Sequence, residues 1–543
     1  MAGSNMENYE EARRNFKWKV PEYFNYGFDV IDKRASENPE KTALITVETG
    51  GVEHAKHSFR ELSDESNKAA NFFLSMGIKK GDRVLVMLPR IPEWYFCILG
   101  LTKLGAIFIP TTTMSTEKDL EFRINKAGAV MAITNTENAE KIEKVQAKCK
   151  TLGKKVLLES PREGWACLRE KCSEFPAELD TEKIGKTKSS DAMLIYFTSG
   201  TESYPKMVLH EQRYALGHEV TARFAQDLRP EDIHWTLADT GWAKTAWGKL
   251  FGQWIVGCTV LQYNQQGKFD ADVALKIIQE FKVSTFCAPP TVYRMMILKE
   301  NLKDFDYSNL RHCMSAGEPL NPEVIKTWRN ATGTTIHDFY GQTETVCLVS
   351  NYSCVPVRPG SMGKPTPGHI VGIVDGEGRV VPAGEEGLIA VRIEPAKPPG
   401  IFREYWQDPE KNAEVFRNGW YFTGDKAYRD EDGYFWFVGR ADDVIKASGY
   451  RIGPFEVESV LIKHPSVAEA AVVGHPDPVR GMVVKAFVIL APGYKGSEQL
   501  TKELQDFVKK ETAPYKYPRV IEYVKELPKT ISGKIRRVEL RKR

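Results

Sequence analysis

The stretch YFTSGTESYPK, residues 196–206, gathers threonine, serine and glycine residues ahead of a single lysine, Lys206. It follows DAMLIYF, residues 191–197, a hydrophobic segment typical of a buried strand. A loop of this composition offers backbone N–H groups and hydroxyls around one cation, which suits a polyphosphate. It is not a Walker A loop, because proline precedes the lysine where that loop requires glycine. Taken alone, the stretch fits a phosphate-binding loop and a solvated turn equally well.

The composition around this loop is typical of a folded protein with several domains. A chain of 543 residues exceeds the roughly 250–300 residues at which a single core stops growing, so we expect at least two domains. Apolar residues make up 42% and charged residues 27%. The net charge of +3 creates no global field, so we predict no nucleic-acid partner, and any phosphate binding must be local.

Membrane insertion and secretion are not predicted. The longest apolar run, residues 95–110, contains Lys103 and two glycines and is shorter than the roughly 20 apolar residues of a membrane span. We interpret it as a buried helix that leads into a strand. Residues 1–16 are polar, unlike a secretory signal. Nine cysteines without a C-x-x-C pair fit neither a disulfide framework nor a zinc site, which favours the reducing cytoplasm.

Helical and strand patterns alternate along most of the chain. Residues 58–77 have the pattern of an amphipathic helix, whereas residues 82–89 and 282–289 have that of buried strands. This alternation is typical of α/β proteins with parallel sheets. The turn-rich stretch 356–400, with the strand patterns VGIVD and LIAVRI, predicts a small β subdomain.

The pattern changes after Arg440. It continues as strand, helix (EVESVLIKHP), two strands and a lysine-rich helix, which is typical of an α+β unit. The sequence therefore predicts an α/β protein with two domains. Residues 1–440 form a large N-terminal domain of αβ-layered sheets with its β subdomain, and residues 441–543 form a small α+β C-terminal domain.

Four further motifs accompany the opening loop in a fixed order along the chain: YGQTE at 340–344, TGD at 423–425, GRADD at 439–443 and PKTISGK at 528–534. Together they resemble the adenylate-forming enzymes, the superfamily of acyl-CoA synthetases, luciferases and peptide-synthetase adenylation domains. The resemblance covers nearly the whole chain, and five motifs are far more specific than one.

Within that superfamily, four other segments are most similar to the medium-chain acyl-CoA synthetases. They are WKVPEYFN at 18–25, DTGW at 239–242, SGYRIGPFEVE at 448–458 and APYKYPR at 513–519. The resemblance implies that ATP, with Mg²⁺, activates a short- or medium-chain carboxylic acid to acyl-AMP, and that coenzyme A then displaces AMP. An in-line phosphoryl transfer needs positioned cations and donors, so no protein nucleophile is required.

The resemblance also implies which residues bind ATP: Thr198, Ser199, Gly200, Thr201, Lys206, Gly317, Glu318, Pro319, Asp338, Phe339, Tyr340, Asp425 and Arg440. The loop residues with Lys206 would hold the β- and γ-phosphates. The segments 317–319 and 338–340 would contact adenine. Asp425 would accept hydrogen bonds from the ribose hydroxyls, and Arg440 would support the ribose or a phosphate.

For catalysis, the resemblance assigns Glu344 as the Mg²⁺ ligand, Thr343 as a contact of the α-phosphate, and Lys534 as the bridge between the carboxylate and the α-phosphate. A lysine in such a basic tail is otherwise merely solvated. Lys534 reaches the site only if the small domain folds over it. The small domain is therefore expected to be mobile, with Asp442 as its hinge.

The rotated small domain would line the channel for the pantetheine arm of coenzyme A with Ser448, Gly449 and Arg451. A side chain at position 449 would obstruct that channel. The resemblance also makes a homodimer plausible.

The acyl pocket is predicted from DTGWAKTAWGKLFGQW, residues 239–254, and from nearby motifs: Trp242, Lys244, Trp247, Cys287 and Gly341. Large indoles there would shorten the pocket and favour a small or branched acid. Tryptophans at this spacing, Trp254 included, are more often core. Equally, Lys244 could be solvated and Cys287 a plain buried thiol.

Two residues depart from the family pattern: Glu202 and Ser203 replace a small hydroxyl residue and a glycine. A carboxylate ~4 Å from a phosphate charge costs ~4 kcal/mol at an effective dielectric constant of 20. We therefore expect Glu202 to point away from the phosphates or to join the water shell of the metal. Three alternatives stay open: an aryl-acid CoA ligase, a luciferase-like oxygenase, and a non-catalytic nucleotide sensor.

Overall fold

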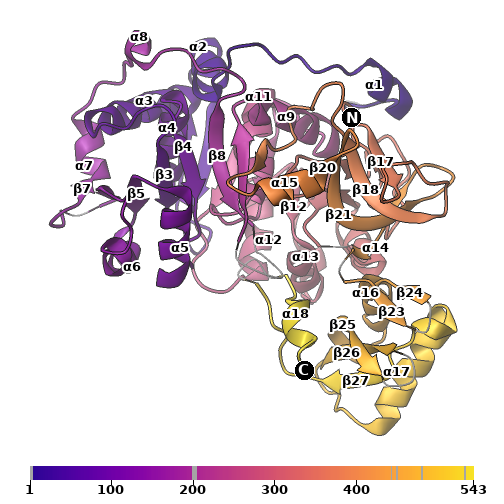
Figure 1. Cartoon of the computed structure of the whole chain (residues 1–543). Helices are drawn as coiled ribbons and strands as arrows, with labels where there is room; N and C mark the ends of the chain where they lie inside the picture. Colours follow the sequence, from indigo (N-terminus) through magenta and orange to yellow (C-terminus); the bar gives the residue numbers. More distant parts are fainter. Residues whose placement is uncertain are drawn as a thin grey trace.

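The computed structural model describes residues 4–159, 161–198, 205–318, 320–441, 443–447, 450–477, 481–530 and 534–543. Two large sheets flanked by helices and an antiparallel β subdomain form the upper part of the molecule in Figure 1. The C-terminal segment, coloured orange to yellow, forms a separate small unit below them. The predicted fold class is therefore confirmed.

The first sheet has eight strands, of which six run parallel and two pair antiparallel at one edge. In spatial order they are β19 (Glu404–Tyr405), β9 (Met207–Glu211), β8 (Ala192–Phe197), β4 (Ile107–Pro110), β3 (Arg83–Met87), β5 (Met131–Thr134), β6 (Lys154–Leu157) and β7 (Ala166–Cys167). The helices that precede or connect these strands are α3 (Phe59–Ser75), α4 (Pro92–Lys103), α5 (Glu117–Ala127), α6 (Thr136–Gln146), α7 (Leu168–Ser173) and α8 (Thr181–Ile184).

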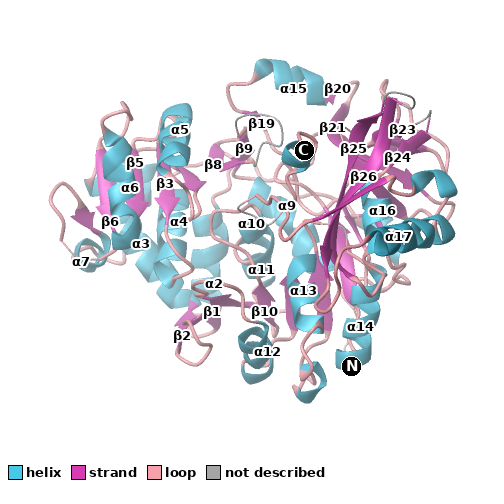
Figure 2. Ribbon diagram, turned by 90° about the horizontal axis from the view of Figure 1, so that it is seen from below, coloured by secondary structure: helices cyan, strands magenta, loops and turns pink. Residues whose placement is uncertain are grey.

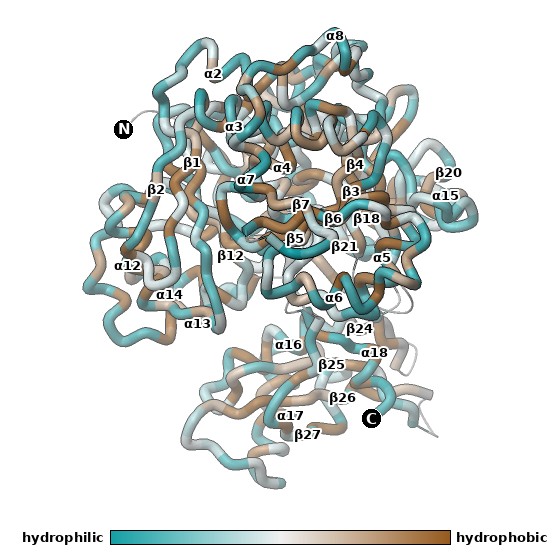
Figure 3. Tube along the Cα trace, turned by 90° about the vertical axis from the view of Figure 1, so that its left-hand side faces the viewer, coloured by the Kyte–Doolittle hydropathy of each residue, from teal (hydrophilic) through white to brown (hydrophobic). Residues whose placement is uncertain are grey.

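Residues of β3 alternate between two cores. Val84 and Val86 pack with α3 and α4 in one cluster, whereas Leu85 and Met87 pack with α5 and α6 in another. Successive side chains of a strand point to opposite faces, so helices cover both faces of the sheet. This double burial explains why its parallel strands are continuous apolar runs. Figure 3 shows these runs as brown segments inside a paler and teal exterior.

The second sheet has nine strands, six of them parallel. In spatial order they are β16 (Lys364–Pro365), β15 (Val349–Ser350), β14 (Ile336–Tyr340), β13 (His312–Ser315), β12 (Thr285–Ala288), β10 (Ile233–Thr236), β11 (Thr259–Tyr263), β1 (Thr42–Val47) and β2 (His54–Ser58). Its helices and those of the N-terminal segment are α1 (Tyr9–Asn15), α2 (Lys33–Glu37), α9 (Tyr214–Val220), α10 (Lys244–Gly248), α11 (Phe251–Val256), α12 (Ala271–Glu280), α13 (Pro290–Ile297) and α14 (Pro322–Thr332).

Because parallel strands end at the same edge of a sheet, β13 and β14 deliver the segments 317–318 and 340–344 to one place. The β subdomain lies beside this edge, with β17 (Val371–Val374), β18 (Glu386–Arg392), β20 (Phe416–Arg417), β21 (Trp420–Arg429), β22 (Phe435–Arg440) and the helix α15 (Pro409–Val415). In its β21–β22 pair, Asp425 lies opposite Arg440.

The small C-terminal unit has its own core of buried apolar residues. Its elements are β23 (Ile445–Ala447), β24 (Tyr450–Ile452), α16 (Pro454–Leu461), β25 (Val467–Asp477), β26 (Gly481–Leu490), α17 (Glu498–Glu511), β27 (Val520–Tyr523) and α18 (Arg537–Leu540). Figure 2 shows α16 and α17 beside the long strands β25 and β26. The order of strands and helices predicted after Arg440 is confirmed, except that two short strands, β23 and β24, precede α16 where one was predicted.

Several local predictions are also confirmed. The helix expected at 58–77 is α3, and it begins with a capping box in which Ser58 and Glu61 satisfy each other's backbone N–H groups. The apolar run 95–110 is the buried helix α4 followed by β4. Among the described residues, no helix combines the length and apolar character needed to cross a bilayer. All nine cysteines are free thiols.

Candidate functional site

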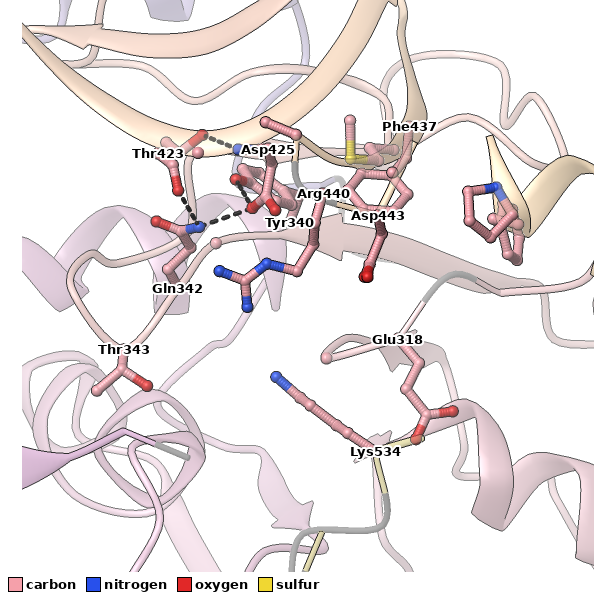
Figure 4. Close-up of a pocket in the computed structure, with 18 of the residues that line it drawn as sticks. Glu318, Tyr340, Gln342, Thr343, Thr423, Asp425, Phe437, Arg440, Asp443 and Lys534 are labelled. Atoms are coloured by element: carbon pink, nitrogen blue, oxygen red, sulfur yellow. Dashed lines mark hydrogen bonds between the residues drawn. The ribbon is translucent and has the colours of Figure 1, made fainter. Parts of the chain in front are cut away.

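A cavity of about 550 Å³ opens between the edge of the second sheet, the β subdomain and the small domain (Figure 4). Its lining brings together the described residues that the sequence predicted for ATP binding and catalysis: Thr198, Lys206, Gly317, Glu318, Asp338, Phe339, Tyr340, Thr343, Glu344, Asp425, Arg440 and Lys534. These residues come from distant parts of the chain. The cavity is therefore one site that both domains complete.

Asp425 is held at the wall of the cavity by side chains of the YGQTE segment. Its Oδ2 accepts hydrogen bonds from the Tyr340 hydroxyl and from Nε2 of Gln342, both at 2.6 Å. Gln342 is in turn oriented by the Tyr421 hydroxyl, which donates to its Oε1 at 2.8 Å. Burial raises the pKa of Asp425, and the opposite charge of Arg440 counteracts that rise. The carboxylate therefore has a fixed orientation.

Glu344 is a second carboxylate of the cavity. Its Oε1 accepts a hydrogen bond from the Tyr405 hydroxyl at 2.8 Å, and burial raises its pKa. The preceding residue, Thr343, is fixed through its carbonyl oxygen, which lies 2.8 Å from Nε2 of His210. The Thr343 side chain points into the cavity (Figure 4). Both residues line the cavity.

The base of the opening loop is closed by two hydrogen bonds between Thr198 and Lys206. The Thr198 N–H donates to the Lys206 carbonyl at 3.0 Å, and the Lys206 N–H donates to Oγ1 of Thr198 at 3.3 Å. The Lys206 ammonium lies 5.4 Å from the centre of the Tyr405 ring. Burial lowers the pKa of Lys206 most, and the positive charge of Lys411 lowers it further. Lys206 is therefore a partly buried cation at the base of the loop.

Lys534 enters the cavity from the small domain. Two hydrogen bonds with Thr530 place it: its N–H donates to Oγ1 of Thr530 at 3.1 Å, and its carbonyl accepts from the Thr530 N–H at 2.7 Å. Its Nζ points toward the space between Arg440 and Thr343 (Figure 4). The following helix, α18, is fixed to its own domain by Arg537, which binds both oxygens of Glu458 at 2.6 and 2.8 Å.

The segment after β13 forms another wall of the cavity. Gly317 has φ +100°, a backbone conformation that favours glycine, and a Cβ there would lie 3.2 Å from Nζ of Lys244. Glu318 is held by Arg294 at 3.2 Å and by the Thr291 hydroxyl. Asp338 is buried, which raises its pKa well above the usual value. Gly317 thus leaves the backbone without a side chain at this wall, and the Glu318 carboxylate is held by Arg294 and Thr291.

Two family models match the chain: AMP-binding enzyme over residues 31–406, and AMP-binding enzyme C-terminal domain over residues 456–534. The chain belongs to the AMP-binding enzyme family. It is 46% identical over 549 residues to the Homo sapiens acyl-coenzyme A synthetase ACSM3, mitochondrial, covering 99% of this chain and 93% of the relative. It is 45% identical over 542 residues to the Homo sapiens acyl-coenzyme A synthetase ACSM4, mitochondrial, covering 98% and 92%. The suspected resemblance is confirmed.

Solved structures of the same architecture include acid–CoA ligases. The anthranilate CoA ligase AuaEII, in complex with anthranoyl-AMP, superposes with a TM-score of 0.88 at 33% identity, over 96% of this chain and 98% of that one. The Brucella canis acyl-CoA synthetase superposes with a TM-score of 0.76 at 37% identity, over 99% of each chain.

The residues predicted for the acyl pocket of this AMP-binding enzyme have different environments. Trp247 is buried under Gly341, where a Cβ would lie 2.2 Å from the end of its indole ring, so only glycine fits. Lys244 is not simply solvated, because its ammonium donates to the Ala316 carbonyl at 2.6 Å and burial lowers its pKa. Of the five, only Gly341 lines the cavity itself.

The other two residues predicted for the acyl pocket are Trp242 and Cys287, and Trp254 lies in the same stretch of sequence as Trp242. Trp242 is partly exposed, and Cys287 is buried in β12, which raises its thiol pKa. Trp254 is fully buried in the core, and its indole N–H donates to the Ala43 carbonyl at 3.0 Å. Trp254 is therefore a core residue, the alternative that the spacing of the tryptophans favoured.

Sequence reasoning missed three residues that shape the cavity: Tyr405, Tyr421 and Arg294. None belongs to a quoted motif, and each acts on a partner far away in the chain. Seven predicted residues lie outside the described part of the chain: Ser199, Gly200, Thr201, Pro319, Asp442, Ser448 and Gly449. The same holds for Glu202, Ser203 and the Arg451 side chain.

Proposed function

We propose that this AMP-binding enzyme is an AMP-forming acid–CoA ligase, an acyl-CoA synthetase of the medium-chain type. The observation that carries the proposal is the meeting of Asp425, Glu344, Lys206 and Lys534 around one cavity. Identity of 46% to acyl-coenzyme A synthetases over the whole chain supports it. The substrates are ATP, a carboxylic acid and coenzyme A, with Mg²⁺ as the metal.

ATP is proposed to lie along the cavity. The adenine would lie against the backbone at 317–318 and 338–340. Asp425, oriented through Oδ2 by Tyr340 and Gln342, would accept hydrogen bonds from the ribose hydroxyls. The phosphates would extend toward Lys206 and the loop that it closes, because a partly buried ammonium binds a polyanion more strongly than an exposed one.

The residues around Glu344 fit a bound Mg²⁺. The ion prefers oxygen ligands and is usually held by one or two carboxylates together with phosphates and water. Here the Glu344 carboxylate and Thr343 both line the cavity, and among the described residues no cluster of three or more His, Cys, Asp or Glu side chains offers a complete cage. When bound, Mg²⁺ supplies positive charge that neutralises the phosphates during transfer.

The first reaction joins the acid to AMP. A carboxylate oxygen attacks the α-phosphorus, the bond from that phosphorus to the bridging oxygen breaks, and pyrophosphate leaves with its electron pair. The Lys534 ammonium, directed between Arg440 and Thr343, would bind both the carboxylate and the α-phosphate as negative charge accumulates. In the second reaction, the thiolate of coenzyme A attacks the acyl carbon and AMP leaves.

The two reactions need different arrangements of the two domains, proposed as residues 1–440 and 441–543. The arrangement seen here has Lys534 in the cavity, which suits the first reaction. Rotation about Asp442 would withdraw that lysine and bring Ser448, Gly449 and Arg451 to the site for coenzyme A.

The acid is proposed to be short, branched or a simple aryl acid. Trp247 fills the space directly beneath Gly341 and packs on Phe339 at 5.6 Å between ring centres, so an acyl chain entering there meets an indole wall. An aryl-acid CoA ligase is the second candidate, favoured by the likeness to an anthranilate CoA ligase.

Replacing Trp247 with alanine should lengthen the acyl site. Removing the indole opens space beneath Gly341, so we expect the preferred acid to become longer by several carbons, with at least tenfold lower kcat/KM for the original best acid. The measurement is kcat/KM across straight-chain acids. Trp328→Phe, in the core of the second sheet, is the control for a general packing defect; equal chain-length profiles in wild type and the alanine variant would contradict the assignment.

The compartment and assembly are also proposals. The nine free thiols suit a reducing compartment such as the cytoplasm, whereas the named relatives are mitochondrial. A homodimer is proposed from family likeness, and analytical ultracentrifugation of the purified protein measures it.

The experiment that tests the function is pyrophosphate release from ATP and Mg²⁺ with straight, branched and aromatic acids of two to ten carbons, with and without coenzyme A. We expect release with a subset of short, branched or aromatic acids, and continued turnover only when coenzyme A is present. ATP binding without release for any acid would replace this proposal with the nucleotide sensor.

A further inference from the structure

Tyr405 lies where two parts of the proposed ATP site meet. It is the second residue of β19, pairs with Val208 of β9 and is 5% exposed. Its hydroxyl donates to Oε1 of Glu344 at 2.8 Å, and its ring centre lies 5.4 Å from the ammonium of Lys206. One side chain therefore contacts both the carboxylate proposed for the metal and the cation proposed for the phosphates.

The backbone of Tyr405 is held by hydrogen bonds at both its N–H and its carbonyl. Its N–H donates to Oδ1 of Asn412 at 2.7 Å, and its carbonyl accepts from Nδ2 of the same residue at 2.8 Å. The Glu344 carbonyl is bound by the Phe402 N–H at 2.8 Å, three residues before Tyr405. Because both partners of the Tyr405–Glu344 hydrogen bond are anchored through their backbones, the bond has little freedom to adjust when a ligand arrives.

The chemistry of the two contacts explains why a tyrosine is suited to this place. A phenol hydroxyl donates a hydrogen bond to a carboxylate without adding charge, so it fixes one oxygen and leaves the negative charge available to a cation. The electron-rich ring face attracts an ammonium within about 6 Å and competes little with a phosphate for it. Phenylalanine would keep the second contact and lose the first.

We propose that Tyr405 is a positioning residue for magnesium-bound ATP, which fixes Glu344 through its hydroxyl and Lys206 through its ring. The proposal rests on the proposed function, since it assigns these two residues to the metal and the phosphates. In this proposal Tyr405 acts through Glu344 and Lys206 and is assigned no direct contact with the metal or the phosphates. It holds the Glu344 carboxylate in the orientation that the metal needs. The entropy cost of ordering that side chain therefore arises on folding and not when ATP binds.

The test compares Tyr405→Phe with the wild type in three assays on the full chain. In the adenylation reaction, we expect the Mg²⁺ concentration for half-maximal rate to rise about five- to tenfold, because a hydrogen bond to a charged group is lost. The rate at saturating Mg²⁺ should stay within about twofold. Thioester formation from supplied acyl-AMP and coenzyme A should be unchanged. Calorimetry of ATP with Mg²⁺, without an acid, should show correspondingly weaker binding.

Tyr434→Phe is the matched control. Its hydroxyl donates to the Pro356 carbonyl at 2.8 Å, and its ring lies under Arg358 at 4.2 Å and Lys364 at 4.9 Å, but it does not line the cavity. This variant should match the wild type in all three assays. An unchanged Mg²⁺ dependence in Tyr405→Phe would overturn the proposal, and so would an equal loss in both half-reactions, which indicates a structural role.

The calorimetric assay separates the failure of this proposal from failure of the proposed function. If no acid gives pyrophosphate release in the wild type, the ligase assignment fails. Binding of ATP with Mg²⁺ to the wild type and to Tyr405→Phe still decides the role of Tyr405. Weaker binding only in the variant supports the positioning role, and equal binding removes it.

Discussion

Lys534→Ala should reduce acyl-AMP formation by at least about three orders of magnitude and leave thioester formation from supplied acyl-AMP near the wild-type rate. The lysine is the only proposed catalytic group that the small domain contributes to the cavity, and it is directed between Arg440 and Thr343. A cation placed at a phosphoryl transition state contributes most of its energy in that state. The measurement is single-turnover kinetics of each half-reaction.

The control is Lys525→Ala, which removes an exposed lysine of the same domain nine positions earlier in the chain. It should leave both half-reactions unchanged. If Lys534→Ala slowed both half-reactions equally, the lysine would serve the stability of the domain or its contact with the large domain. The assignment of one half-reaction to the arrangement seen here would then be wrong.

Glu344→Gln should lower the rate of pyrophosphate release by a factor on the order of 10²–10³, because an amide binds Mg²⁺ far more weakly than a carboxylate. Folding should not suffer. Burial raises the pKa of Glu344, so the folded state binds more protons than the unfolded state and loses stability as the pH rises through that pKa. Glutamine removes this penalty and still accepts from the Tyr405 hydroxyl. We therefore expect a Tm at or above that of the wild type.

The pH dependence gives a second test of Glu344. The protonated carboxyl does not bind the metal, so activity at limiting Mg²⁺ should fall as the pH drops through the raised pKa. This acid limb should start at a higher pH than for an ordinary glutamate, and it should be absent from the residual activity of Glu344→Gln. A wild-type acid limb that persists unchanged in the variant would assign the titration to another group, such as Asp425.

Much of the fold and of the cavity could be predicted because its signals are local in the sequence. The helix α3 has its capping box within four consecutive residues, and β3 is a short apolar run between turns. The cavity could be predicted because YGQTE begins at Tyr340, the last residue of β14, and TGD lies within β21. Resemblance then supplied roles that local patterns alone do not give.

What could not be predicted depends on contacts between distant segments. Tyr405 acts on Glu344, 61 residues away, and Lys244 donates to Ala316, 72 residues away. Neither partner leaves a pattern in the neighbouring sequence. Trp247 and Trp254 lie seven residues apart, yet only the first reaches Gly341, while the second bonds to Ala43 in the core. Helix packing decides between them, and spacing along the chain does not.

We propose that the acid is activated through an adenylate in this cavity, and one isotope measurement tests this directly. The best acid of the panel, labelled with ¹⁸O in both carboxylate oxygens, is incubated with the enzyme, ATP, Mg²⁺ and coenzyme A. The masses of the products are then measured by mass spectrometry. Attack of the carboxylate on the α-phosphorus predicts one ¹⁸O in each AMP and none in pyrophosphate. Unlabelled AMP, or ¹⁸O in inorganic phosphate with ADP as product, would contradict the account.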